Sequence, residues 1–257
     1  MDTSPVWRVP RLWRLLLALS RIVVFPLARL RVTNGVPEEL RGGPVILAAN
    51  HVSPFDPVVL MAACHKAGVV PRIMATGGVF RTPVVGAVMR HCGHIRVDRN
   101  TMHVADALPV AAKALAENSA VLVYPEGRIG LDPWMWPERG KTGTARMAQL
   151  SGAPVLPVAQ WGTHAVIPWE APKGLGRALV KALVRRPVVQ VRFGDRAVDL
   201  AGAGSGSPGA QAMQGTRLIM EAIDETLTPL RLGEMQMPRT VDTSRPHDLS
   251  RVRRRMH

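Results

Sequence analysis

Six short apolar runs, most of them rich in β-branched residues, recur along this chain and constrain its fold more than any other feature. They occupy residues 45–49, 69–75, 95–97, 120–124, 154–160 and 188–193. Runs of this kind predict strands, several of them buried on both faces. Helical patterns occupy residues 54–67, 102–118, 142–150 and 210–230, and Pro109 marks a bend or a late start in the second of these. Strands separated by helices predict a single α/β domain whose mixed, mostly parallel sheet is flanked by helices.

The net charge of +14 is concentrated at the two ends of the chain. Residues 1–34 carry +5 and residues 239–257 carry +4, so nine of the fourteen excess charges lie outside the predicted core. This placement argues against a nucleic-acid-binding domain, and we expect no nucleic-acid partner. We expect residues 233–257 to form an Arg-rich tail without fixed structure that adds attraction to acidic lipids.

The N-terminal segment, residues 1–33, has the pattern of an amphipathic helix. Arg11, Arg14 and Arg21 fall on one side of a helical wheel, and leucines with Trp13 cover the rest. This pattern is typical of a helix that lies in the interface of an anionic bilayer, although a helix packed on the core would show it too. The longest uncharged stretch, residues 22–28, is far short of the ~20 apolar residues that a membrane span needs. We therefore expect a peripheral or monotopic protein at the cytoplasmic face of a membrane. Trp134 and Trp136 either contact the membrane interface as well or pack within their own loop.

Chemistry-bearing residues follow the first apolar run. His51 and Asp56 lie five residues apart, and Ser53-Pro54 between them has the pattern of a helix start. Ser53 and Asp56 also have the spacing of a capping box, in which the acid merely satisfies backbone donors. The two interpretations are compatible, because an acid fixed by a cap is a rigid partner for an imidazole.

A second charged stretch, Tyr124 to Arg128, follows another apolar run. If the two runs are neighbouring strands, both stretches meet at one rim of the sheet, where open α/β sheets bind their ligands. A neutral imidazole backed by a carboxylate can take a proton from a hydroxyl. The chain has no Gly-x-Ser-x-Gly nucleophile elbow. We therefore expect the substrate itself to bring the hydroxyl, which attacks an activated acyl group.

Four ordered motifs make the sequence resemble the glycerolipid (lysophosphatidic acid) acyltransferase family. The first, with four residues between His and Asp, is matched by His51 and Asp56. The second is matched by residues 93–99, the third, Pro-Glu-Gly-Thr-Arg, by residues 125–127, and the fourth, an apolar strand around a proline, by residues 153–158. The likeness covers roughly residues 34–232, which we take as an acyltransferase domain.

The resemblance implies roles for individual residues. His51 would be the base on the acceptor hydroxyl and Asp56 its orienting acid. Residues of the second and third motifs would hold the phosphate and glycerol of the acceptor, namely Arg99, Glu126, Gly127 and Arg128. The eight histidines form no zinc motif and the chain has no glycine-rich nucleotide loop, so we expect no metal and no cofactor besides an acyl thioester co-substrate.

Two departures from the family pattern affect these roles. Arg128 follows Gly127 directly, whereas the family usually has a threonine between them. Thr76 follows Met74-Ala75 where relatives commonly carry a lysine, and Lys141 is a candidate replacement.

We expect the chain to transfer a fatty acyl group from acyl-CoA or acyl carrier protein to the free hydroxyl of 1-acylglycerol 3-phosphate, at a membrane surface with anionic lipids. Two alternatives stay open. The acceptor is another lipid or glycolipid hydroxyl, or the chain is a non-enzymatic basic protein that binds membranes or nucleic acid.

Overall fold

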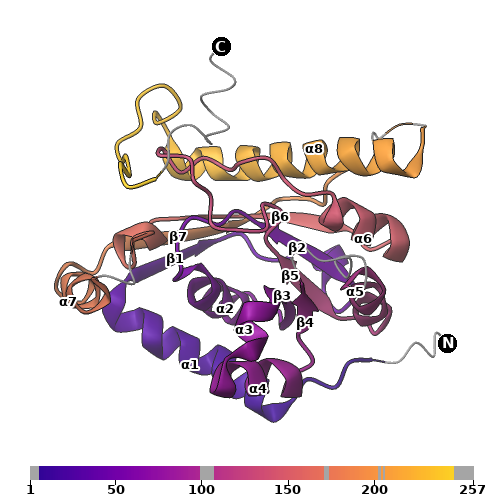
Figure 1. Ribbon diagram of the computed structural model, residues 1–257, viewed down its shortest axis with the longest axis horizontal. Helices are drawn as coiled ribbons and strands as arrows, with labels where there is room; N and C mark the ends of the chain where they lie inside the picture. The colour runs from indigo at the N-terminus through magenta and orange to yellow at the C-terminus, as the bar shows by residue number, and fades with distance from the viewer. Residues whose placement is uncertain (1–5, 99–106, 171–173, 202–203, 205, 246–257) are drawn as a thin grey trace.

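The structure is a computed structural model that describes residues 6–98, 107–170, 174–201, 204 and 206–245 (Figure 1). Its centre is a seven-stranded sheet in the order β1-β7-β6-β2-β5-β3-β4. The strands are β1 (Arg29–Thr33), β2 (Val45–Ala49), β3 (Pro71–Thr76), β4 (Ile95–Val97), β5 (Ala120–Val123), β6 (Val155–Trp161) and β7 (Val188–Phe193). Only the β6–β7 pair is antiparallel. The predicted α/β fold with a mixed, mostly parallel sheet is confirmed.

Eight α-helices are described around the sheet, within the residues given above. They are α1 (Arg11–Leu27), α2 (Asp56–Lys66), α3 (Gly77–Arg81), α4 (Pro83–His91), α5 (Ala107–Ala116), α6 (Gly143–Ser151), α7 (Leu175–Arg185) and α8 (Pro208–Leu227), with short 3₁₀ turns η1 (Glu38–Leu40), η3 (Thr163–Ala165) and η6 (Thr228–Arg231). Four of the helices, α2, α5, α6 and α8, fall on the helical patterns of the sequence. Residues 102–106 of the second pattern lie outside the described part.

The helices form a layer on each face of the sheet (Figure 1). Side chains from α1 and α2 pack on one face, and side chains from α5, α6 and α8 pack on the other. Strand β2 is buried on both faces because successive side chains alternate between them. Val45, Leu47 and Ala49 point to the α1–α2 layer, whereas Ile46 and Ala48 point to the α5–α6–α8 layer. This explains why β2 is continuously apolar.

The parallel register brings the chemistry-bearing loops to one edge. Ala48 of β2 lies opposite Val123 of β5, so these two strands end together. On its other side β2 pairs in parallel with β6, where Ala49 lies opposite Val158. The loops that begin at Asn50, Tyr124 and Gly162 therefore leave the sheet side by side.

The N-terminal segment is part of the fold. Trp13, Leu17 and Val24 of α1 are buried, and the Trp13 Nε1–H donates to the carbonyl of Pro71 at 3.0 Å. Strand β1 pairs with β7 at the edge of the sheet. The structure therefore shows no division of the chain at residue 33. One face of α1 is buried against the core, and β1 is a strand of the central sheet. Other apolar side chains of α1 remain exposed, with Ile22 at 67% and Phe25 at 71%. Across the described residues, no helix has the length and apolarity that a membrane crossing requires.

The C-terminal region also differs from expectation. Residues 228–245, which we call the C-terminal strap, follow α8 and return toward the carboxyl edge of β2. Arg231 and Arg245 are almost fully buried in it. The prediction of a tail without structure therefore does not hold for residues 233–245, and residues 246–257 lie outside the described part. Trp136 is buried as well and packs on Arg231, so it takes the loop-packing alternative and not a place at a membrane interface.

Candidate active site

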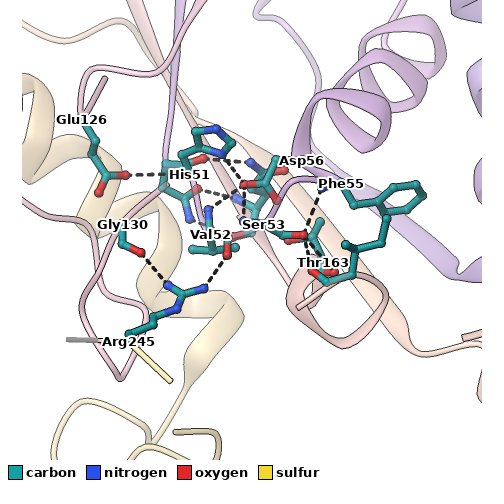
Figure 2. A network of polar contacts seen from close by, with 12 residues as sticks. His51, Val52, Ser53, Phe55, Asp56, Glu126, Gly130, Thr163 and Arg245 are labelled. Atoms are coloured by element: carbon teal, nitrogen blue, oxygen red, sulfur yellow. Dashed lines mark hydrogen bonds and ion pairs between the residues drawn. The ribbon is translucent and has the colours of Figure 1, made fainter. Parts of the chain in front are cut away.

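His51 and Asp56 are in direct contact (Figure 2). The His51 Nδ1 lies 2.7 Å from the Asp56 Oδ2. The same oxygen accepts the backbone N–H groups of Val52 at 2.6 Å and Ser53 at 2.9 Å, and Asp56 is fully buried. Because an ionised carboxylate only accepts, the proton of neutral His51 is assigned to Nδ1, which leaves the lone pair on Nε2. The pair thus has the arrangement of a base with its orienting acid.

The predicted capping box is only half formed. Asp56 accepts the Ser53 N–H, as the acid of such a box does, but α2 begins at Asp56 with Phe55 as its N-cap residue and has no side-chain cap hydrogen bond. The Ser53 hydroxyl accepts from the Phe55 N–H at 3.0 Å and donates to the Ile167 carbonyl at 2.6 Å. These bonds tie the loop to the segment after β6, and they leave Ser53 in a structural role.

Asn50 fixes the other end of this loop. Its side chain donates to the Gln160 carbonyl at 3.0 Å and accepts from the Gln160 N–H at 2.8 Å. The Gln160 side chain returns a bond to the Asn50 carbonyl at 2.8 Å. This reciprocal amide pair locks the end of β2 to β6. Sequence reasoning missed it, although an asparagine directly before the histidine at a strand end was a usable signal.

The aromatic ring of Tyr124 lies against the imidazole. The ring centroids of His51 and Tyr124 are 4.0 Å apart with an interplanar angle of 16°, which is a stacked arrangement. Burial, followed by the charge of Asp56, raises the pKa of Tyr124 well above its ordinary value, so the phenol stays neutral. Tyr124 therefore restricts the plane of the His51 ring without adding charge.

Glu126 clamps two loops together. Its Oε1 accepts from the His51 N–H at 3.0 Å, and its Oε2 accepts from the Glu138 N–H at 2.8 Å. Burial raises the pKa of this carboxyl to about 8, although the two backbone donors oppose the shift. Both oxygens are thus engaged by the protein itself. The expected role of Glu126 toward the acceptor stays a prediction, beside this structural role of holding the His51 N–H.

Gly127 and Arg128 form the turn that follows Glu126. Gly127 has a φ of +73°, and its N–H donates to the Tyr124 carbonyl at 2.9 Å. This left-handed conformation favours glycine. The Arg128 Nη2 donates to Glu138 at 3.2 Å, while 48% of the arginine side chain remains exposed. Arg128 is therefore anchored at one end and accessible at the rim.

Lys141 lies at this turn, whereas Thr76 lies at the end of β3. The side chain of Lys141 passes over Gly127, and the backbone N–H of Lys141 donates to the Pro125 carbonyl at 2.8 Å. Thr76 is the N-cap of α3 and accepts from the Gly78 N–H at 3.4 Å. Arg99 lies outside the described residues. The structure thus gathers His51, Asp56, Glu126, Gly127, Arg128 and Lys141 at one edge of the sheet.

Neither a reactive cysteine nor a metal site is found among the described residues. Burial in α2 raises the pKa of Cys64 to about 12, which keeps it a neutral thiol. Among the residues that the structure describes, no three His, Cys, Asp or Glu side chains are grouped so as to hold a metal ion. The fold and this edge together define an α/β protein with a hydrogen-bonded histidine–aspartate pair at the carboxyl ends of parallel strands.

The comparisons agree with this class. The model of the Acyltransferase family matches residues 29–161, and the chain belongs to that family. An uncharacterized protein of Mycobacterium tuberculosis is 29% identical over 145 residues, which are 52% of this chain and 38% of that protein. A 1-acyl-sn-glycerol-3-phosphate acyltransferase of Borreliella burgdorferi is 30% identical over 125 residues, 47% of this chain and 46% of that protein. The chain thus matches less than half of the length of these two curated relatives.

One solved structure shows the same fold. The crystal structure of the 1-acyl-sn-glycerophosphate acyltransferase PlsC from Thermotoga maritima aligns with a TM-score of 0.59. The alignment covers 83% of this chain and 78% of that one, at 19% sequence identity. At this identity the likeness concerns the fold alone.

Proposed function

We propose that the protein transfers a fatty acyl group from acyl-CoA or acyl carrier protein to the free hydroxyl of 1-acylglycerol 3-phosphate, giving phosphatidic acid. The observation that carries this proposal is the contact between His51 and the buried Asp56. The names of curated relatives that match over part of this chain support the choice of acceptor.

His51 is the only residue that has to accept and return a proton in this reaction. The Nε2 of His51 takes the proton of the acceptor hydroxyl as its oxygen attacks the thioester carbonyl carbon. Asp56 stabilises the imidazolium that forms. The carbon–sulfur bond then breaks, and the leaving thiolate takes the proton from the imidazolium. The products are an ester and a free thiol, and His51 returns to its neutral form.

The rim residues would bind the acceptor head group. The exposed part of Arg128 offers N–H donors to a phosphate, and Lys141 lies beside the same turn. Arg99 keeps its proposed role from the family resemblance. The closeness of Arg128 to Glu138 favours a second candidate, in which the acceptor is another lipid or glycolipid hydroxyl without a phosphate. In that case the arginine serves only to hold its loop.

A panel of acceptors with labelled acyl-CoA distinguishes these candidates. Lysophosphatidic acid should be acylated at least about tenfold faster than monoacylglycerol or a lysophospholipid whose phosphate carries a head group. This factor corresponds to roughly 1.4 kcal/mol of selective binding to the free phosphate. Equal rates on monoacylglycerol would favour the second candidate. Failure to consume the thioester with every acceptor, and with acyl carrier protein as donor, would contradict an acyltransferase function.

We also propose that the protein binds membranes peripherally, at their cytoplasmic face, through the exposed sides of α1 and α7. Figure 1 shows α7 beside the end of α1. The Arg186 guanidinium joins them, because it donates to the Phe25 carbonyl at 2.6 Å and lies over the Phe25 ring. Val184 of α7 is 79% exposed and lies together with Val180 among Arg177, Lys181 and Arg185. Helix α1 adds three arginines to its exposed apolar side chains. Exposed apolar side chains among cations suit the surface of an anionic bilayer.

A further inference from the structure

Arg245, in the C-terminal strap, reaches the catalytic loop from the far end of the sequence. Its Nη2 donates to the Val52 carbonyl at 2.6 Å, and its Nη1 donates to the Gly130 carbonyl at 2.8 Å (Figure 2). Its Nε donates to the Asp242 carboxylate at 2.9 Å. The side chain is fully buried. All three kinds of guanidinium nitrogen are therefore used in one rigid arrangement.

The two carbonyls belong to the two loops that build the site. Val52 follows His51 directly, and its N–H already donates to Asp56 at 2.6 Å. The Gly130 N–H donates to the His51 carbonyl at 2.8 Å. Arg245 thus closes a ring of contacts that runs from His51 through Val52 and the guanidinium to Gly130, and back to His51. Glu126 holds the N–H of His51 within the same network (Figure 2).

The strap is anchored before it reaches the site. The Arg231 guanidinium lies 3.8 Å from the ring centroids of both Trp136 and Trp161, and its Nε donates to Glu234 at 3.0 Å. Farther along, the Asp242 N–H donates to the Pro133 carbonyl at 2.8 Å. These contacts place Arg245 firmly. A flexible strap would lose the geometric advantage of a bidentate guanidinium.

We propose that Arg245 is a positioning residue for the His51–Asp56 pair and that the C-terminal strap completes the active site. Arg245 lies outside the part of the chain that the family model matches, residues 29–161. Without the guanidinium, the two carbonyls lose their buried donors, and the His51 loop can shift relative to Glu126 and Asp56. Displacements of about 1 Å in a catalytic group can cost about 100-fold in rate. The proposal rests on the proposed acyl transfer for its kinetic readout.

The test compares Arg245→Met and Arg245→Lys with the matched control Arg239→Met in the full-length protein. Arg239 lies in the same strap, is exposed, and donates only a long 3.4 Å bond to the Leu232 carbonyl. Arg245→Met should lower kcat by about 10- to 100-fold, with little change in the KM for the acceptor. Arg245→Lys keeps the charge and one or two donors, so it should recover part of the loss. Arg239→Met should match the wild type.

A second measurement does not depend on turnover. In ¹⁵N-histidine-labelled protein, the Nδ1–H of His51 bonded to Asp56 should give a downfield proton resonance that is missing in His51→Ala. This resonance should be broadened or lost in Arg245→Met and retained in Arg239→Met. If Arg245→Met does not fold, Arg245→Lys is compared in its place, and a weakened resonance supports the proposal. An unchanged resonance and an unchanged kcat in a folded Arg245 variant would overturn it. Absence of acyl transfer by the wild type would count against the proposed function, and the resonance would still test Arg245.

Discussion

At the scale of single residues, contacts from three side chains, those of Asp56, Glu126 and Tyr124, hold His51 in place. Asp56 uses one oxygen for three donors, and Glu126 uses both oxygens for backbone N–H groups. Tyr124 sets the plane of the ring from one side. Two of these acids thus act on the same histidine, one on its side chain and one on its backbone. Their substitution should have different consequences.

Replacing Asp56 by Asn tests the side-chain contact. The amide keeps the shape of the carboxylate but no longer stabilises an imidazolium, and it can turn its NH₂ toward Nδ1. We expect kcat to fall by about 10³- to 10⁴-fold, in line with the effect of the equivalent change in a serine protease triad. Steady-state acyl transfer measures this loss. A far smaller loss in a variant that remains folded by circular dichroism would argue against Asp56 as the orienting acid.

Glu126 predicts a dependence of stability on pH. Its pKa is raised to about 8 in the folded state, from an ordinary value near 4.5. Since ionisation is then harder in the folded than in the unfolded state, this group costs no stability below about pH 4.5, and its cost grows until about pH 8. Glu126→Gln removes the titration but loses one acceptor, which lowers stability by a constant amount. We expect the stability gap between wild type and variant to narrow by up to a few kcal/mol as the pH rises from 5 to 8.

Denaturant unfolding at several pH values measures this gap. The contributions of the other titrating groups cancel in the difference between the two proteins. A gap that stays constant from pH 5 to 8, and that narrows only as the pH falls below about 4.5, would show that Glu126 has a lowered pKa and is held ionised by its donors.

At the scale of secondary-structure elements, most strands and five of the eight described helices follow directly from local pattern, whereas β1, α3, α4 and α7 do not. Strands β2 and β6 are recognisable because burial on both faces makes them continuously apolar. Strand β1 reads Arg-Leu-Arg-Val-Thr and lies at the sheet edge with alternating exposure, so its signal is weak next to that of the preceding helix. Helix α7 is amphipathic, yet its apolar side chains are mostly exposed and not packed in the core. A prediction that looks for a buried apolar face therefore misses this helix.

The exposed side of α7 gives a prediction of its own. If α1 and α7 dock on a bilayer together, Val180→Ser with Val184→Ser should weaken binding to anionic vesicles by about tenfold or more. The estimate follows because a buried apolar side chain contributes roughly 1.5–3 kcal/mol. Co-sedimentation with vesicles of phosphatidylglycerol and phosphatidylcholine measures the binding. Val110→Ser is the control, because Val110 is 53% exposed but lies on α5. Equal losses in all variants, or none, would contradict a docking face on α7.

At the scale of the whole molecule, the site is assembled from parts that are far apart in sequence. The pairing of β2 with β5 was inferable, because parallel neighbours end at one edge and both motifs follow apolar runs, whereas the pairing of β2 with β6 came only from the structure. The His51–Asp56 contact followed from spacing. Arg245 was not inferable, because it lies 193 positions after Val52 in a stretch whose composition indicates disorder. Burial of an arginine is decided by tertiary partners, and local sequence does not encode them.

The direct test of the account is acyl transfer by His51→Ala, measured beside the wild type with labelled acyl-CoA and lysophosphatidic acid under single-turnover conditions. The wild type should form phosphatidic acid, and His51→Ala should be slower by about 10³-fold or more while its melting temperature and vesicle binding stay close to those of the wild type. Transfer by His51→Ala at a rate near that of the wild type would contradict catalysis by the histidine–aspartate pair.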